Sequence, residues 1–199
     1  MNREELLAAL ARHAPSEARE EESLSRMRRF VAAPEDPFAR GNPEGHVTAS
    51  AVVARPDGAA FLLVFHRKLS RWLQPGGHVE EADASAFEAA LREAREETGI
   101  ASFGTPIGEE ILDVDVHAIP ARGRDPAHFH FDVRYLLTTE SEIDRAAADD
   151  PSRPMVWRTF GEALASGVDA SLARALEKAR TVFAANLAIV TEKIRPVSR

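Results

Sequence analysis

The chain has 199 residues, of which 44% are hydrophobic and 29% charged, a composition typical of one globular domain with some helical additions. Its formal net charge of −7 provides no broad attraction to nucleic acid or anionic membranes, so neither is expected as a partner. The absence of cysteine excludes disulfides, thiolate metal sites and cysteine nucleophiles. No apolar run is long enough to cross a bilayer, and the first residues lack the apolar core of a signal peptide, so we expect a cytoplasmic protein.

The N-terminal part of the chain differs in character from the rest of the sequence. Residues 3–12 and 17–32 carry apolar side chains at helical spacing, and residues 34–45 are rich in proline, glycine and asparagine. We therefore predict an N-terminal helical extension over residues 1–45 and a main domain over residues 46–199. A flexible arm, or a contact within a homodimer, would have the same sequence pattern.

The main domain begins with alternating, β-branched residues that are typical of strands. Residues 46–54 and 59–66 flank a segment of turn-forming residues, which predicts a β-hairpin. A loop is predicted next, and it includes Trp72 and residues 75–78. The remaining pattern predicts strands near residues 107–118, 128–138 and 155–160, and helices at residues 161–166 and about 169–190.

Residues 86–98 give the clearest helical pattern in the chain. Ser85 suits the N-cap, Glu88 stands at the capping-box position, and Gly99 suits the left-handed residue that ends a helix. Successive residues of a helix are rotated by about 100°. One face of this helix therefore collects the side chains that should pack on a sheet, namely Phe87, Ala90, Leu91, Ala94 and Thr98.

Three carboxylates lie beside that packing face of the helix. Glu93, Glu96 and Glu97 fall within an arc of about 100°, where like charges repel one another. A divalent cation would relieve the repulsion, and hard cations such as Mg²⁺ prefer oxygen ligands. A solvated acidic surface with no ligand would have the same composition.

The segment from Gly77 to Gly99 resembles the Nudix box. That pattern is a glycine, five residues, a glutamate, seven residues, and then Arg-Glu-hydrophobic-any-Glu-Glu-any-Gly-hydrophobic. The second half matches without a gap, because residues 92–100 read Arg-Glu-Ala-Arg-Glu-Glu-Thr-Gly-Ile. In the first half, Asp83 stands where the family has glutamate, and eight residues rather than seven separate it from Arg92. The loop is thus one residue longer than the pattern, and its acid is one methylene shorter.

The resemblance implies a fold, a reaction and a set of roles. The fold would be an α/β/α sandwich around a mixed β-sheet, with helix 86–98 on one side and the C-terminal helix on the other. The reaction would be metal-dependent hydrolysis of a phosphoanhydride bond in a small-molecule nucleoside diphosphate derivative. The implied ligands of Mg²⁺ or Mn²⁺ are Glu93, Glu96, Glu97 and the backbone carbonyl of Gly77, while Arg92 would fix the shape of the loop by holding a carboxylate or carbonyl. The general base would be Glu93 or an acid or histidine from a loop.

Several side chains outside the box suit a phosphate-binding site. His128, His130 and Asp132 alternate along one predicted strand, so they share a face and could bind phosphate, supply a base or ligate a metal. Arg67, Lys68 and Arg71 precede the glycine-rich loop and could meet substrate phosphates, although ordinary surface charge explains them slightly better. The remaining histidines near the loops are more typical of structural positions when each is considered alone, and these are His46, His66 and His78.

Other functions are compatible with parts of this pattern. A non-catalytic nucleotide sensor with a Nudix fold is the main alternative, although the three intact box glutamates favour catalysis. A related isoprenoid diphosphate isomerase would need a cysteine, and the chain has none. A protein-binding module with a merely acidic helix would bind no Mg²⁺.

Overall fold

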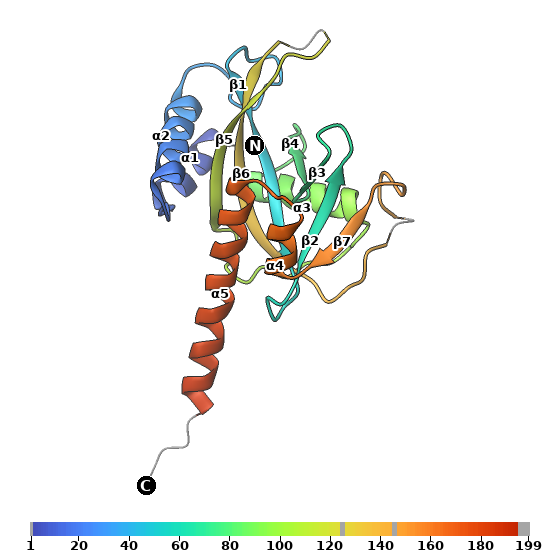
Figure 1. Cartoon of the computed structure of the whole chain (residues 1–199). Coiled ribbons are helices and arrows are strands. Elements are labelled where there is room, and N and C mark those ends of the chain that lie inside the picture. The colour runs from blue at the N-terminus through green and yellow to red at the C-terminus, as the bar shows by residue number, and fades with distance from the viewer. Residues whose placement is uncertain (1, 124–125, 145–146, 195–199) are drawn as a thin grey trace.

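The computed structural model describes residues 2–123, 126–144 and 147–194, which Figure 1 shows in colour. The first residue of the predicted extension and residues 195–199 of the predicted main domain lie outside these ranges. The helices are α1 (Arg3–Arg12), α2 (Ala18–Ala32), α3 (Ala86–Thr98), α4 (Phe160–Ala165) and α5 (Ala170–Ile194). The strands are β1 (Gly45–Ala54), β2 (Phe61–His66), β3 (Arg71–Leu73), β4 (Gly76–His78), β5 (Ile111–Ile119), β6 (His128–Thr138) and β7 (Met155–Arg158).

The strands form one mixed sheet, as the sequence predicted. The order is β3-β2-β1-β6-β5, with β4 paired to β1 and β7 paired to β2. Strands β1 and β6 run parallel from the pair Gly45 and Phe129 to the pair Ala54 and Thr138, whereas β5 and β6 are antiparallel. Both central strands are buried along most of their length. Strand β1 consists mainly of apolar and small residues, whereas the first part of β6 alternates polar and apolar side chains.

The predicted hairpin is present only at its turn. Ala54 lies opposite Phe61, and the amide of Arg55 donates to the carbonyl of Ala60 at 2.9 Å. Beyond this point β1 pairs with β4 and β6, while β2 pairs with β3 and β7. The predicted loop between β2 and α3 was wrong in part, because it contains the short strands β3 and β4, which are formed by pairing with distant segments.

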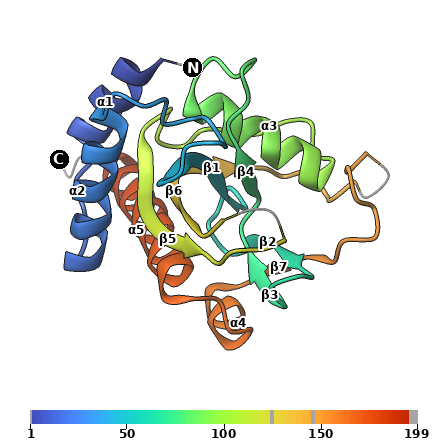
Figure 2. The same ribbon diagram turned by 90° about the horizontal axis from the view of Figure 1, so that it is seen from above.

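Helices cover both faces of the sheet, which confirms the α/β/α architecture (Figure 2). Along β1, Val47, Ala49 and Val53 belong to the core that also contains residues of α1, α2 and α3. The alternate residues Val52 and Ala54 belong to a second core, which includes residues of α4 and α5. The two-residue period of a strand divides its side chains between these two cores.

Helices α1 and α2 of the N-terminal extension pack directly against the sheet. The Phe30 ring of α2 stacks on the Phe131 ring of β6, with centroids 3.8 Å apart. Leu10 and Met27 are completely buried in the same core. The extension therefore shares its hydrophobic core with the sheet. No helix of the described ranges combines the length and apolar character needed to cross a lipid bilayer.

Candidate active site

The box helix α3 begins and ends where the sequence predicted. The Ser85 side chain accepts a hydrogen bond from the Glu88 amide at 3.2 Å, which caps the first turn. Gly99 ends the helix with φ of 70°, and a Cβ atom there would lie 1.9 Å from the carbonyl oxygen of Asp144. Glycine is thus required at this position both by the left-handed backbone and by the close approach of another segment. The predicted packing residues are all buried, and these are Phe87, Ala90, Leu91, Ala94 and Thr98.

The three box carboxylates are partly buried. The side chains of Glu93 and Glu97 are 15% and 16% exposed, and that of Glu96 is 39% exposed. Burial raises the pKa of Glu93, and the charges of Glu97 and Glu96 raise it further, against the lowering effect of Arg92. Burial likewise raises the pKa of Glu97. Such carboxylates bind a cation or a proton more readily than solvated ones.

Arg92 holds the loop that precedes the helix. Its guanidinium donates to both carboxylate oxygens of Asp83 at 3.0 Å and to the carbonyl of His78 at 2.9 Å. Burial opposes the charge of Asp83, but the hydrogen bonds from Arg92 and from the Glu80 amide outweigh it, so the pKa of Asp83 is lowered. The shorter acid in the longer loop is therefore the partner of Arg92.

Two arginines form ion pairs with the three box glutamates. Arg92 also donates to Glu93 at 3.0 Å and to Glu96 at 2.9 Å. Arg153, from the segment before β7, forms an ion pair with Glu97. The pairing of Arg153 with Glu97 has no local signal in the sequence, because the two residues are 56 positions apart.

Gly77, in the segment that precedes the helix, lies against the carboxylate of Glu93. A Cβ atom at this position would lie 2.5 Å from the Oε1 atom of Glu93, so the glycine allows the backbone and the carboxylate to approach closely. The potential metal-ligand atoms gathered here are carboxylate and carbonyl oxygens, which suit a hard divalent cation. Within the described ranges the three glutamates do not converge on one point, since Arg153 holds Glu97 while Arg92 holds the other two. Their chemistry and partial burial fit a cation that replaces these arginine contacts.

The predicted substrate-binding arginines lie directly after β2 and at the start of β3. The Arg67 guanidinium donates to the carbonyl and hydroxyl of Ser152, at 2.6 and 3.1 Å, in the segment that also carries Arg153. Arg71 is exposed at the start of β3. Among the described residues, neither arginine forms an ion pair with a box glutamate.

The predicted cluster on β6 is more extensive than the sequence indicated. Asp132 accepts hydrogen bonds from the hydroxyls of Thr48 and Ser50 at 3.0 and 2.8 Å and from Arg134 at 2.9 Å, so it organises the polar face of the sheet. His130 instead lies among other histidines, including His46 with ring centroids 4.8 Å apart. His46 and His78, which looked structural when considered singly, belong to this group.

Comparison with known proteins places this chain in a family. The family model described as NUDIX domain matches residues 44–179, while no curated protein sequence matches the chain. Solved structures with a similar fold include a MutT NUDIX hydrolase from Burkholderia pseudomallei (23% identity, TM-score 0.49, covering 66% of this chain and 95% of that one). Two others are the ADP-ribose complex of the NUDIX domain of Shewanella oneidensis NrtR (20%, 0.48, covering 77% and 96%) and a C. elegans Ap4A hydrolase (19%, 0.46, covering 71% and 97%). Because the family model covers well over half of the chain, including the whole box, the chain belongs to the Nudix family.

Proposed function

We propose that this protein hydrolyses a phosphoanhydride bond in a nucleoside diphosphate-linked small molecule, with Mg²⁺ or Mn²⁺ held by Glu93, Glu96, Glu97 and the carbonyl of Gly77. The observation that carries the proposal is the close placement of the partly buried carboxylate of Glu93 against Gly77, which leaves room for it, on the same helix as the partly buried Glu97. The family fold alone would not support this reaction, because one fold can host different functions and the residues of the site decide between them.

The residues present suit attack of water on phosphorus. A bound cation would neutralise phosphate oxygens and lower the pKa of a water molecule. Glu93, or an acid or histidine from a neighbouring loop, would accept the proton of that water. Arg92 would act as a positioning residue, since it fixes Asp83 and the backbone of the loop.

The substrate phosphates would meet side chains outside the helix. His128 and His130 lie side by side on β6 with ring centroids 5.3 Å apart, and both are partly exposed. We propose that they face the substrate, together with the exposed cations Arg67 and Arg71. Arginine suits phosphate because its guanidinium can form two parallel hydrogen bonds.

The proposal is tested with purified protein, Mg²⁺ or Mn²⁺, and a panel of nucleoside diphosphate derivatives. The panel includes nucleotide sugars, dinucleoside polyphosphates, dinucleotide coenzymes and oxidised nucleoside triphosphates, with released phosphate, pyrophosphate and nucleotide as the readout. Glu97→Gln removes one proposed ligand, and Glu88→Gln changes an exposed glutamate on the same helix as the matched control.

We expect metal-dependent hydrolysis that Glu97→Gln reduces by about 100-fold or more and that Glu88→Gln leaves intact. Tight nucleotide binding with no cleavage of any compound would instead identify a sensor. Failure to bind Mg²⁺ or Mn²⁺ at all would show that the acidic helix is only a surface.

A further inference from the structure

Five of the seven histidines of the chain gather at one end of the sheet, and they are His46, His78, His117, His128 and His130. The pairing of the strands produces this cluster. His46 of β1 lies directly beside His130 in the parallel register with β6, and His78 of β4 lies opposite Thr48 of β1. Neighbouring strands are about 4.8 Å apart, so side chains on one face of these three strands must meet.

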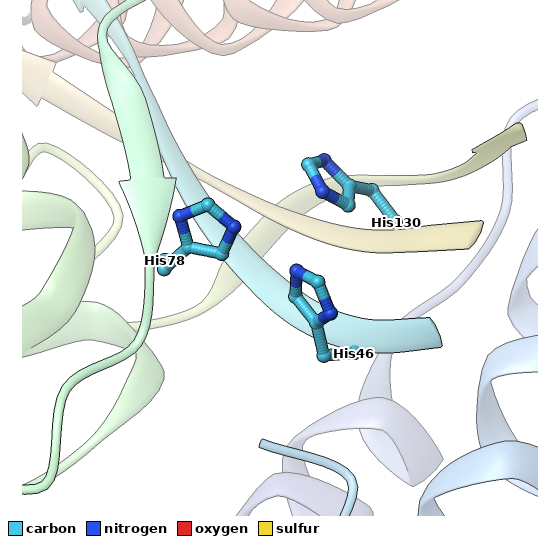
Figure 3. A group of neighbouring side chains, drawn as sticks. All are labelled: His46, His78 and His130. Carbon is cyan, nitrogen blue, oxygen red and sulfur yellow. The ribbon is translucent and has the colours of Figure 1, made fainter. Parts of the chain in front are cut away.

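Three members of the cluster direct their rings toward a common point, as Figure 3 shows. One ring nitrogen from each of His46, His78 and His130 lies within 4.8 Å of the others. Three imidazole nitrogens bound to one tetrahedral cation at about 2.0–2.1 Å would be roughly 3.4 Å apart. Modest side-chain rotations would bring them to that spacing, and His78 and His130 are partly exposed whereas His46 is buried.

His46 supplies an independent indication that a ligand binds here. The residue is only 3% exposed, and within the described part of the chain neither ring nitrogen has a hydrogen-bond partner. Leaving a buried polar group unsatisfied costs on the order of 1–3 kcal/mol. Buried histidines with a purely structural role are normally hydrogen-bonded, so the unsatisfied nitrogens of His46 are better explained by a ligand that binds to this ring.

The protonation of the cluster also suits a cation. Burial, together with the neighbouring His78 and His128, lowers the pKa of His46 to about 4. Burial lowers the pKa of His130 to about 3, and burial lowers that of His78 as well. Neutral imidazole is the form that binds metal. Arg40 is the cationic side chain of another segment that acts on His46 and His78, and it is exposed, so solvent screens its charge.

We propose that His46, His78 and His130 form a binding site for a borderline transition-metal cation of the Zn²⁺ class, separate from the carboxylate site of the box. Nitrogen ligands select such cations over Mg²⁺, which requires oxygen. Three protein ligands leave a further coordination position, which water or a phosphate oxygen can fill. The nearby imidazole of His117, held by Asp115 at 3.0 Å, and that of His128 border this position.

The test is a titration of untagged protein with Co²⁺, and then Zn²⁺, in the presence of excess Mg²⁺. Co²⁺ reports nitrogen ligands and low coordination number through its visible absorption bands. We expect one Co²⁺ per chain, displaced by Zn²⁺ but not by Mg²⁺. His78→Asn and His130→Asn should each weaken binding by about 10- to 100-fold. His66→Asn removes a histidine outside the cluster and should not change it.

Glu97→Gln separates this site from the proposed function. The absorption bands should persist in that variant, because the box glutamate is no ligand of this cation. The proposal is overturned if the wild-type protein binds neither Co²⁺ nor Zn²⁺, a result that needs no variant to fold. It is also overturned if binding survives in both histidine variants, or if binding disappears in Glu97→Gln. Circular dichroism of each variant confirms that the fold is retained.

Discussion

Lys178 of α5 donates a hydrogen bond to the carboxylate of Glu20 of α2, an ion pair that joins the last helix to the N-terminal extension. The Glu20 side chain is completely buried, and it also accepts hydrogen bonds from the His13 ring at 2.7 Å and from the Ser16 amide at 2.6 Å. The two helices belong to opposite faces of the sheet, so this pair closes the fold around the edge strand β5.

The Glu20 pair predicts a pH-dependent contribution to stability. Burial opposes the charge, but the hydrogen bonds from His13, Lys178 and Ser16 outweigh it and hold the pKa of Glu20 well below its ordinary value of 4.5. The contribution is therefore fully present above pH 4.5 and is lost as pH falls through the lower folded-state pKa. We expect Glu20→Gln to lower the free energy of unfolding by about 3 kcal/mol at pH 7 and by less in acid.

Urea unfolding at neutral and acidic pH measures this difference. The exposed neighbour Glu22, changed to Gln, is the control and should alter stability little at either pH. An effect of Glu20→Gln that stays constant down to pH 3 would show that the charge of this carboxylate does not stabilise the fold.

Gly77→Ala should impair activity while leaving the protein folded. The added Cβ atom would meet the end of the Glu93 side chain, which can move aside, rather than backbone that cannot. We expect kcat to fall by about 10-fold or more because a misplaced ligand disturbs the reacting geometry. Gly41→Ala, where a Cβ atom would meet nothing within 4 Å, is the matched control. Unchanged kinetics in Gly77→Ala would show that the close approach of Glu93 to the backbone is not needed for activity.

Asp83→Asn tests the positioning role of the Arg92 contact. The amide keeps the size of the carboxylate but removes the charge that holds the guanidinium. Arg92 should then interact more with Glu93 and Glu96, so we expect the Mg²⁺ concentration for half-maximal activity to rise about 10-fold, with kcat at saturating Mg²⁺ nearly unchanged. Glu81→Gln, exposed in the same loop, is the control. A fall in kcat that excess Mg²⁺ does not restore would mean that Asp83 takes part in the chemistry itself.

Arg153→Ala should make the protein depend more on its cation. Without Arg153, the partly buried Glu97 loses a charge that lowers its pKa, and the metal-free protein should lose about 1–3 kcal/mol of stability. Mg²⁺ no longer competes with the guanidinium, so it should raise the Tm of the variant more than that of the wild type. Arg67→Ala loosens the same segment at Ser152 without touching Glu97, and it should not show the larger metal effect. An equal Tm increase in all three proteins would contradict the competition.

The box and its helix could be predicted from sequence because their signals are local. Ser85, Gly99 and the spacing of the carboxylates all act within one helix, where about 3.6 residues per turn fix their relation. The short strands β3 and β4 could not be predicted in this way, because distant partners create them. The same holds for the histidine cluster, in which His46 and His130 meet only through the parallel pairing of β1 and β6.

His78 belongs both to the box and to the histidine cluster. Its carbonyl accepts a hydrogen bond from Arg92, while its imidazole faces His46 and His130. Any backbone shift at residue 78 that accompanies cation binding to its ring would alter that hydrogen bond and, through Arg92, the carboxylates that Arg92 holds. Occupancy of the histidines and affinity at the box would then be thermodynamically linked through one peptide unit. Such linkage is reciprocal, so the free energy by which one cation alters the binding of the other must be the same in both directions.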